Sequence, residues 1–429
     1  MIRRASLTNR VSATPSLFSS HANGPKSRSR TDRDHQVARR FETAALFAGI
    51  GGIELGFARA GHETSLFCEI DTAARAVLQA RFPDDVRFHD DVCSLKALPR
   101  GVEILTAGFP CQDLSQAGKT AGIAGRRSGL VAELFRVLRQ SRVPRVLVEN
   151  VPFMLQLDGG RALDVILGEF ERLGYDWAYR IVDSRGFGVP QRRERVFILA
   201  CQDEDPRAVL LADDVGPRDA GAWRPGQAFG FYWTEGIRGL GSAVDAVPTL
   251  KGGSTIGIPS PPAILLRSGS VVTPDIRDAE RMQGFPANWT RPAESVARAS
   301  FRWKLVGNAV TVHVAQWIGR RLSRPGTYDD SLDRTLEHGA PWPRAAWARS
   351  SKRFASNVSS YPVHRTPSRI EDFLRYPTKN LSARATSGFL GRARVSSLRF
   401  PEGFLPALEK HLLRVKQTEV PAASRRSKS

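Results

Sequence analysis

Cys111 is the residue of this sequence whose surroundings best suit nucleophilic chemistry. It follows a proline in Gly108-Phe109-Pro110-Cys111-Gln112, directly after a short apolar segment, where a side chain is poorly placed for packing. A thiol becomes a nucleophile when nearby positive charge or a helix N-terminus lowers its pKa. The next segment, 113–129, is basic and rich in glycine, as expected of a closing lid. A lone cysteine is more often inert, so its partners decide the matter.

A carboxyl group and two guanidinium groups complete a plausible reactive set. Glu149 ends the apolar segment before Asn150, and Arg193 and Arg195 lie in the sequence GVPQRRER. A thiolate can add to an electrophilic ring carbon while an acid exchanges a proton with a ring nitrogen, and arginines can orient that acid. Charged runs of this kind are otherwise typical of solvated strand ends.

These residues follow segments that read as strands alternating with helices. This alternation predicts an α/β fold with an open, mainly parallel sheet of Rossmann type, in which ligands bind at the carboxyl ends of the strands. The expected strands are 43–47, 64–70, 86–92, 102–107, 145–148, 177–182 and 195–200. The expected helices are 53–60, 72–82, 130–140 and 163–173, and helical periodicity returns at 301–322.

The ends of the first three expected strands suggest a nucleoside site. A glycine-rich turn, Phe47-Ala48-Gly49-Ile50-Gly51-Gly52, follows the first strand, although such turns are often purely structural. Glu69 follows about twenty residues later, at the spacing where an acid meets ribose hydroxyls. Asp91 ends the third strand and could meet an adenine amino group, or it could simply cap a turn. Two acids suit a nucleoside with a cationic sulfur better than a phosphate-rich ligand.

Five short motifs in this order resemble the DNA cytosine-5 methyltransferase family. They are FAGIGG, GFPCQDLS, ENV, GVPQRRER and KLVGNAV, and the likeness covers residues 43–201 and 279–322. The resemblance implies a Rossmann-like sheet that binds S-adenosylmethionine, with a small target-recognition domain inserted into it. It also implies methyl transfer to C5 of a cytosine flipped out of double-stranded DNA. Two departures are Ile70, where many relatives have an aromatic residue against adenine, and Ala309, where serine is common.

Carried over residue by residue, the resemblance assigns a catalytic role to four side chains. Cys111 attacks C6 of cytosine, Glu149 contacts N3 and favours its protonation, and Arg195, with Arg193, holds the base and supports Glu149. Methyl transfer to C5 and loss of the C5 proton then release Cys111. The implied cofactor-binding residues are Phe47, Gly49, Ile50, Glu69, Asp91, Val92, Gly108, Pro110, Leu130, Asn308, Ala309 and Val310.

Charge is distributed unevenly along the 429 residues, whose net charge is +20. Residues 1–40 contain nine Lys or Arg against two Asp or Glu, and residues 331–429 contain nineteen against seven. The intervening part is nearly balanced, as in an ordinary enzyme. Basic flanks suit a polyanion such as DNA, although they could also serve only for solubility.

The composition also bounds the compartment and the chemistry. The four cysteines form no CxxC pair and have no zinc-like spacing, so we expect reduced thiols, no metal and a cytoplasmic protein associated with the nucleoid in use. Cys68, Cys93 and Cys201 lie in apolar contexts and are expected to be buried. No apolar run is long enough to cross a membrane. The N-terminal segment predicts a disordered basic tail, with a transit peptide as the alternative.

Four regions are predicted. Residues 1–40 form the tail, residues 41–203 and 301–324 the catalytic and cofactor-binding domain, residues 204–300 the target-recognition domain, and residues 325–429 a basic extension with a disordered end. The extension, with Trp342, Trp347, Phe389 and Phe400, is expected either to contact DNA or to form a helical cap.

The expected function is that of a DNA (cytosine-5-)-methyltransferase (EC 2.1.1.37). We expect a bacterial restriction–modification enzyme acting as a monomer, with a cognate restriction endonuclease as a possible partner encoded nearby. Two alternatives stay open: a tRNA cytosine-5 methyltransferase and a catalytically inactive DNA-binding relative. The intact Cys111, Glu149 and Arg195 argue against the second.

Overall fold

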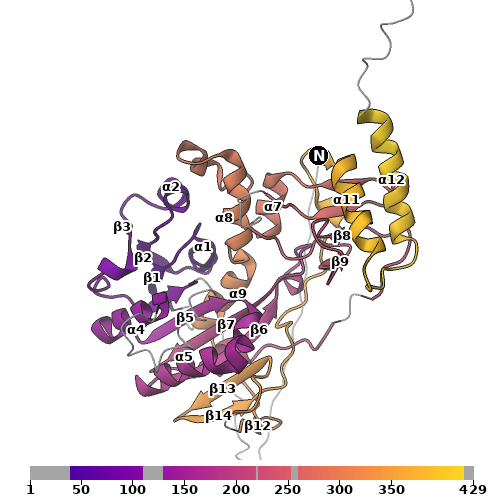
Figure 1. Ribbon diagram of the computed structural model, residues 1–429. Helices are drawn as coiled ribbons and strands as arrows, with labels where there is room; N and C mark the ends of the chain where they lie inside the picture. The colour runs from indigo at the N-terminus through magenta and orange to yellow at the C-terminus, as the bar shows by residue number, and fades with distance from the viewer. Residues whose placement is uncertain (1–38, 110–128, 219–220, 253–258, 338, 420–429) are drawn as a thin grey trace, which may run out of the picture. The chain divides into compact units, whose positions relative to one another are not determined.

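The computed structural model describes residues 39–109, 129–218, 221–252, 259–337 and 339–419. Within these ranges, ten strands form one sheet and five form a second (Figure 1). The order of the large sheet is β12-β14-β13-β6-β7-β5-β4-β1-β2-β3, and that of the small sheet is β15-β11-β10-β8-β9.

The parallel half of the large sheet is the part that the sequence predicted. It consists of β1 (Glu42–Leu46), β2 (Glu63–Cys68), β3 (Arg87–His89), β4 (Ile104–Ala107) and β5 (Arg145–Asn150), whose pairings are all parallel. The chain moves outward from β1 to β2 and β3, and then returns to place β4 on the other side of β1. A ligand crevice forms where neighbouring strands diverge in this way. The crevice therefore falls between the ends of β1 and β4.

Helices cover both faces of this sheet. On one face α4 (Gly129–Ser141) and α5 (Arg161–Arg172) pack into a core, as their apolar stripes predict (Figure 1). On the other face α1 (Gly52–Ala58), α6 (Arg207–Leu210) and α9 (Val312–Ser323) contribute Phe57, Val209 and Ile318 to a second core. The short α2 (Thr72–Arg81) follows β2 and begins at Asp71, whose carboxylate accepts hydrogen bonds from two backbone N–H groups.

The rest of the large sheet is antiparallel, so the expectation of a mainly parallel sheet was wrong for this half. Strands β6 (Asp176–Asp183) and β7 (Glu194–Cys201) follow β5, as expected. Beyond β6 the sheet continues with β13 (Ala345–Arg349), β14 (Lys352–Ala355) and β12 (Arg334–Thr335). These three strands come from the region predicted to be a basic extension.

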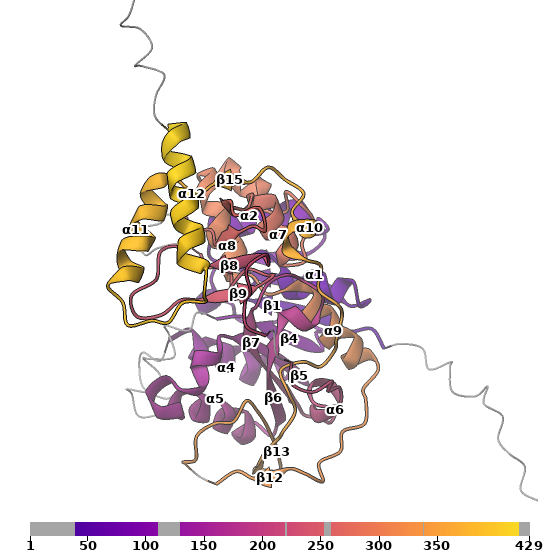
Figure 2. The same ribbon diagram turned by 90° about the vertical axis from the view of Figure 1, so that its right-hand side faces the viewer.

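The small sheet also combines distant parts of the chain. Strands β8 (Phe229–Phe231), β9 (Ser242–Val244), β10 (Ala263–Leu265) and β11 (Val271–Thr273) are joined by β15 (Lys379–Asn380). Helices α11 (Ala383–Arg394) and α12 (Phe404–Glu419) stand beside this sheet (Figure 2). Their Phe389 and Phe404 pack against Phe229 and Phe231 in one core.

Residues 325–337 and 339–419 are therefore shared between the two sheets instead of forming a separate extension. The aromatic residues expected to contact DNA are largely used for packing. Trp347 and Phe389 are buried, Trp342 packs against Trp177, and Phe400 packs against the core of the small sheet. The buried rings of Trp347 and Phe389 are therefore not available to stack on bases.

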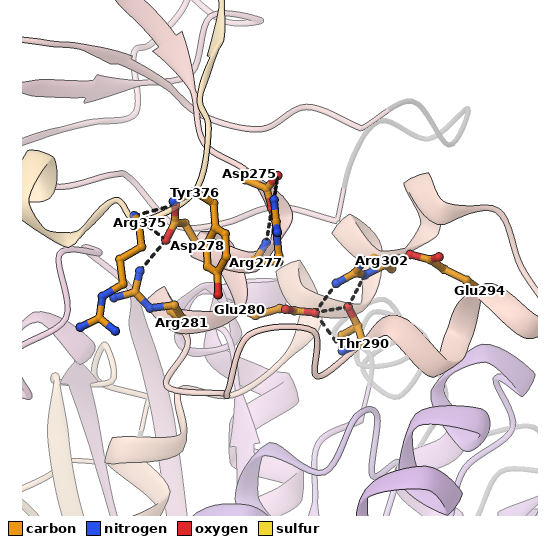
Figure 3. Close-up of polar contacts among 10 residues, drawn as sticks. All are labelled: Asp275, Arg277, Asp278, Glu280, Arg281, Thr290, Glu294, Arg302, Arg375 and Tyr376. Carbon is orange, nitrogen blue, oxygen red and sulfur yellow. Dashed lines mark hydrogen bonds and ion pairs between the residues drawn. The ribbon is translucent and has the colours of Figure 1, made fainter.

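Helix α7 (Ile276–Met282) uses buried carboxylates to contact the segment before β15 and the start of helix α8 (Arg302–Asn308) (Figure 3). Asp278 accepts hydrogen bonds from the backbone N–H groups of Arg375 and Tyr376, at 3.2 and 3.0 Å, just before β15. Glu280 accepts a hydrogen bond from the Arg302 guanidinium at 2.9 Å. Both carboxylates are fully buried, so each would be costly without its partners. The helix thus fixes the incoming C-terminal segment on one side and α8 on the other.

Candidate active site and cofactor pocket

A cavity of about 330 Å³ lies at the predicted crevice, at the carboxyl ends of the parallel strands. Its walls come from the ends of β1, β2, β4 and β5, from α1, and from the junction of α8 and α9. Lining residues include Phe47, Gly49, Ile50, Glu54, Glu69, Ile70, Thr106, Gly108, Leu130, Glu149, Lys304, Asn308, Ala309 and Val310.

The turn after β1 shapes one wall of this cavity. Gly49 has a φ of +56°, in the left-handed region that favours glycine, and its N–H donates a 2.7 Å hydrogen bond to Glu69. Gly52 approaches the late junction so closely that a Cβ atom there would lie 2.9 Å from the Val310 carbonyl oxygen. These glycines therefore bring β1, β2 and the junction of α8 and α9 around one space.

Glu69 is held in place by backbone N–H groups. One oxygen accepts from Gly49 and the other from Asp71, at 2.8 Å. Burial raises the pKa of Glu69, and these two hydrogen bonds offset part of the increase. A fixed carboxylate in this position can accept hydrogen bonds from the two hydroxyls of a ribose.

The late helical segment breaks where it meets the cavity. Periodicity predicted helix over 301–322, but α8 ends at Asn308 and α9 begins at Val312. Ala309 adopts an extended conformation with a ψ of 150°, and the Arg193 guanidinium donates to its carbonyl oxygen at 2.7 Å. The break places Asn308, Ala309 and Val310 on the cavity wall.

Glu149 and Arg195 form an ion pair at the cavity, with 3.0 Å between Nε of Arg195 and Oε1 of Glu149. The pair holds the Glu149 carboxyl group at the cavity wall. Burial raises the pKa of Glu149, while the positive charges of Arg195 and Arg193 lower it. The balance favours a carboxyl group that can hold a proton and deliver it to a ring nitrogen.

Arg193 differs from Arg195 in its contacts. Its guanidinium is fully buried and donates to the carbonyl oxygens of Leu250, Gly307 and Ala309. It therefore fastens the junction of α8 and α9 to the segment that returns from the small sheet. This placement gives Arg193 a positioning role, whereas the ion pair with Glu149 belongs to Arg195.

Ten of the predicted site residues line this one cavity, namely Phe47, Gly49, Ile50, Glu69, Gly108, Leu130, Glu149, Asn308, Ala309 and Val310. Cys111 and Pro110, which follow β4, lie outside the described residues. Asp91 and Val92 do not line the cavity. The Asp91 carboxylate accepts from the backbone N–H of Cys93 and caps the 3₁₀ helix η1 (Val92–Ser94), and Val92 packs in the core.

Two of the other cysteines are buried, as predicted, but Cys93 is exposed. Cys93 lies in η1 beyond the end of β3, because β3 stops at His89 and not at Val92 as the apolar pattern suggested. Burial raises the pKa of Cys68 to about 12 and also raises that of Cys201. Neither buried thiol is therefore suited to nucleophilic chemistry.

Sequence reasoning missed three residues around the site. Glu54 and Thr106 line the cavity, and the Thr106 hydroxyl donates a 2.7 Å hydrogen bond to Glu54. Tyr232, directly after β8, donates a hydrogen bond from its hydroxyl to the Thr249 carbonyl oxygen, next to Leu250, whose carbonyl oxygen accepts from Arg193. The available signal for Glu54 was an acid in the first turn of a helix, two residues after the glycine-rich sequence. Tyr232 gave no comparable signal.

The cavity fits the nucleoside cofactor expected from the sequence. Acids outnumber cations on its walls, and its lysine, Lys304, is paired with Asp71 at 3.2 Å. In the described ranges, no group of three or more His, Cys, Asp or Glu side chains is placed to hold a metal ion. The described helices include none that could span a membrane.

A doubly wound sheet with an acidic nucleoside pocket beside a Glu–Arg pair defines an enzyme of the S-adenosylmethionine-dependent methyltransferase class. A family model described as "C-5 cytosine-specific DNA methylase" matches residues 41–216. The chain is 45% identical over 384 residues to Type II methyltransferase M2.BsuMI of Bacillus subtilis, an alignment that covers 86% of this chain and 97% of the relative. The chain belongs to the C-5 cytosine-specific DNA methylase family.

Other relatives match shorter parts of the chain. Type II methyltransferase M.BanI of Aneurinibacillus aneurinilyticus is 39% identical over 181 residues, covering 41% of each chain. A crystal structure of S. pombe Dnmt2 methyltransferase aligns with 66% of this chain and 98% of its own, with 16% identity and a TM-score of 0.47. The protein methylates C5 of cytosine in DNA and uses S-adenosylmethionine as the methyl donor.

Proposed function

We propose that this chain is a sequence-specific DNA (cytosine-5-)-methyltransferase, EC 2.1.1.37, of a Type II restriction–modification system. The observation that supports it best is the buried Glu149–Arg195 pair on the wall of an acidic cavity, next to the strand that leads into Cys111. The name of its relative from Bacillus subtilis supports the restriction–modification setting. A monomer acting beside a separately encoded restriction endonuclease completes the proposal.

The residues act on the base in a defined order. The Cys111 thiolate adds to C6 of the flipped cytosine, and the Glu149 carboxyl group places a proton at N3, which draws electrons away from C6. Arg195 holds Glu149 in position, and Arg193 fixes the surrounding backbone. S-adenosylmethionine supplies the methyl group when bound. A base then removes the C5 proton, so that the bond to Cys111 breaks and the thiolate is regenerated.

We assign the recognition domain to residues 221–252 and 259–273 together with 379–419. These segments share the small sheet and its core, so they fold as one unit. Exposed Arg384, Lys410, Arg414 and Lys416 give this unit basic groups for phosphate contacts. The Thr249 hydroxyl, in the same unit, donates a 3.0 Å hydrogen bond to the Arg192 carbonyl oxygen, three residues before Arg195, so bound DNA can reach the catalytic residues.

Covalent trapping tests this proposal. Duplex DNA containing 5-fluorocytosine in place of cytosine should form a stable adduct with the enzyme in the presence of S-adenosylmethionine, because fluorine cannot leave as the C5 proton does. Cys111→Ser should form none. An adduct with this variant would contradict the assigned nucleophile, and trapping only on 5-fluorocytosine tRNA would contradict the assigned substrate.

The target sequence is a separate readout. Methylation of random duplex DNA followed by bisulfite sequencing should show protected cytosines within one short sequence. Methylation of cytosines without regard to their neighbours would contradict the restriction–modification proposal, since such a system depends on one defined site.

A further inference from the structure

Glu54 is an acidic residue of the cofactor cavity that has no charged partner. Its side chain is 2% exposed, yet it lines the cavity from α1. Its carboxylate accepts a 2.7 Å hydrogen bond from the Thr106 hydroxyl. Among the residues that the structure describes, no lysine, arginine or histidine lies within ion-pair distance of it. A buried carboxylate without a counter-charge is unfavourable, so its presence on a cavity wall points to a cationic ligand.

The other charged groups of the cavity already have partners. Glu69 accepts two backbone hydrogen bonds, Glu149 pairs with Arg195, and Asp71 pairs with Lys304. Glu54 is thus the cavity acid whose charge is free to meet a ligand. Backbone carbonyl and hydroxyl oxygens can also accept hydrogen bonds from a ligand's N–H groups. Unlike a carboxylate, they carry no negative charge to balance a cation.

The depth of Glu54 in the cavity shows which part of the cofactor it can meet. Its partner Thr106 precedes Gly108 by two residues in and after β4, which corresponds to about 7 Å along the strand. Gly108 lies at the level of Glu149, because a Cβ atom there would be 3.6 Å from the Glu149 carboxylate. Methyl transfer must occur near Glu149. The Glu54 carboxylate therefore lies at a lower level of the cavity than Glu149, away from the place of methyl transfer. S-adenosylmethionine has two cationic groups, and the sulfonium must lie at the place of methyl transfer, so this separation favours the ammonium group as the partner of Glu54.

We propose that the Glu54 carboxylate binds the α-ammonium group at the methionyl end of S-adenosylmethionine. This assignment rests on the cavity being the cofactor site. The ammonium donates a hydrogen bond to the carboxylate oxygen that Thr106 leaves open, and Thr106 keeps the carboxylate facing the cavity. The interaction makes Glu54 a cofactor-binding residue that works independently of the base.

The ionisation of Glu54 gives the interaction a measurable signature. Burial raises the pKa of this carboxyl group to about 7, and the hydrogen bond from Thr106 offsets part of the increase. A bound ammonium group favours the ionised form and lowers that pKa again. Binding near pH 7 should therefore release protons from Glu54.

Binding of three ligands to Glu54→Gln tests the proposal by calorimetry. S-adenosylmethionine and S-adenosylhomocysteine both carry the ammonium group, whereas 5′-methylthioadenosine lacks the whole amino-acid part. Glutamine keeps the size of the side chain and can still accept from Thr106. We expect the first two to bind about tenfold or more weakly, because a charge-assisted hydrogen bond is lost, and the third to bind as in the wild type.

Glu69→Gln is the matched control, since it changes another buried glutamate of the same cavity. It should weaken all three ligands, because all contain a ribose. If Glu54→Gln weakened the binding of S-adenosylmethionine alone, the carboxylate would face the sulfonium. If the variant bound all three ligands with wild-type affinity, Glu54 would have no role in ligand binding. Either result would overturn the proposal. If Glu69→Gln weakened none, the cofactor would bind elsewhere, and the proposed site itself would fail.

Proton release by the wild-type enzyme provides a test that needs no variant to fold. Binding heats of S-adenosylhomocysteine, measured at pH 7 in buffers of different ionisation enthalpy, should reveal proton release. Binding of 5′-methylthioadenosine should release markedly less. Equal release by the two ligands would contradict a role for Glu54 at the ammonium group.

Discussion

The cofactor cavity and the small sheet are assembled in different ways. The cavity uses the ends of consecutive strands, so most of its described walls come from residues 46–149, and the segment 304–310 returns from far along the chain. The small sheet combines short strands of three residues or fewer with helices that follow more than a hundred residues later. This difference predicts that the chemistry and the recognition of DNA can be damaged separately.

The largest effect is expected from Glu149→Gln, on the chemical side. Removal of the acid that protonates N3 should lower kcat by about 10²–10⁴-fold, with S-adenosylmethionine affinity nearly unchanged. Because burial raises the Glu149 pKa and the group acts as an acid, wild-type activity should decrease as pH rises through that pKa. The measurement is single-turnover methylation of a DNA duplex across a pH series.

Glu133→Gln is the control for this change, since it lies on α4 with Arg136 as its partner. It should retain normal kcat and the same pH profile. A Glu149→Gln enzyme that kept the wild-type decrease at high pH would show that another group supplies the proton.

On the recognition side, Phe404→Ala should damage the small sheet alone. Its ring is fully buried and lies 5.1 Å from the rings of both Phe229 and Phe231. Loss of this ring should cost about 3–5 kcal/mol of stability. We expect an unfolding transition at lower temperature and loss of specific DNA binding, while S-adenosylhomocysteine still binds.

Val395→Ala serves as the control within the same unit, because Val395 is 79% exposed. It should change neither property. If Phe404→Ala abolished cofactor binding in proportion to DNA binding, the two regions would form one cooperative unit, and the comparison would fail.

The same contrast explains what the sequence could predict. The parallel strands around Glu69 and Glu149 are local, apolar and bounded by turns, so the strands themselves and a ligand site at their carboxyl ends could be predicted from pattern alone. The pairing of β13 with β6, or of β15 with β11, depends on residues that meet over long distances in the chain. Nothing in a two-residue strand such as Lys379–Asn380 indicates its partner.

Errors within the predicted half have equally specific causes. The apolar pattern of 86–92 includes Val92, which packs in the core, but Asp91 caps η1 and ends the strand early. Asp91 had two interpretations, a contact to adenine or a turn cap, because an acid after a strand looks the same in either role. The cap is present in the structure, and the adenine contact stays a prediction. Glu54 was missed because a single acid in a short helix looks like an ordinary exposed residue in the sequence. Its burial on the cavity wall becomes visible only in the structure.

A smaller effect is expected on stability from Glu54→Gln in the ligand-free enzyme. The folded pKa of about 7 lies above the ordinary value of 4.5, so between these values the folded state holds more protons than the unfolded state. Wild-type stability should therefore fall as pH rises from 4.5 to 7. At pH 8 the variant should be more stable by up to about 3 kcal/mol, provided that glutamine keeps the Thr106 contact.

Chemical denaturation of both proteins at pH 5 and pH 8 measures this difference. The gap between variant and wild type should be small at pH 5 and wider at pH 8. If the difference in unfolding free energy between variant and wild type were equal at pH 5 and pH 8, the ionised Glu54 carboxylate would not be buried. That result would weaken its assignment as a cofactor-binding residue.

The smallest predicted effect concerns the rim of the cofactor cavity. Ile70 is 70% exposed and lines the cavity, at the position where many relatives place an aromatic residue. Ile70→Phe should add a ring face against the adenine, worth about 1 kcal/mol, and tighten S-adenosylhomocysteine binding several-fold. Leu332→Ala, at a comparably exposed site far along the chain, should leave affinity unchanged. The flipped cytosine is expected near Glu149, on the other side of the cavity from Ile70, so kcat should also stay the same. A change in kcat without a change in S-adenosylhomocysteine affinity would show that Ile70 faces DNA and not adenine.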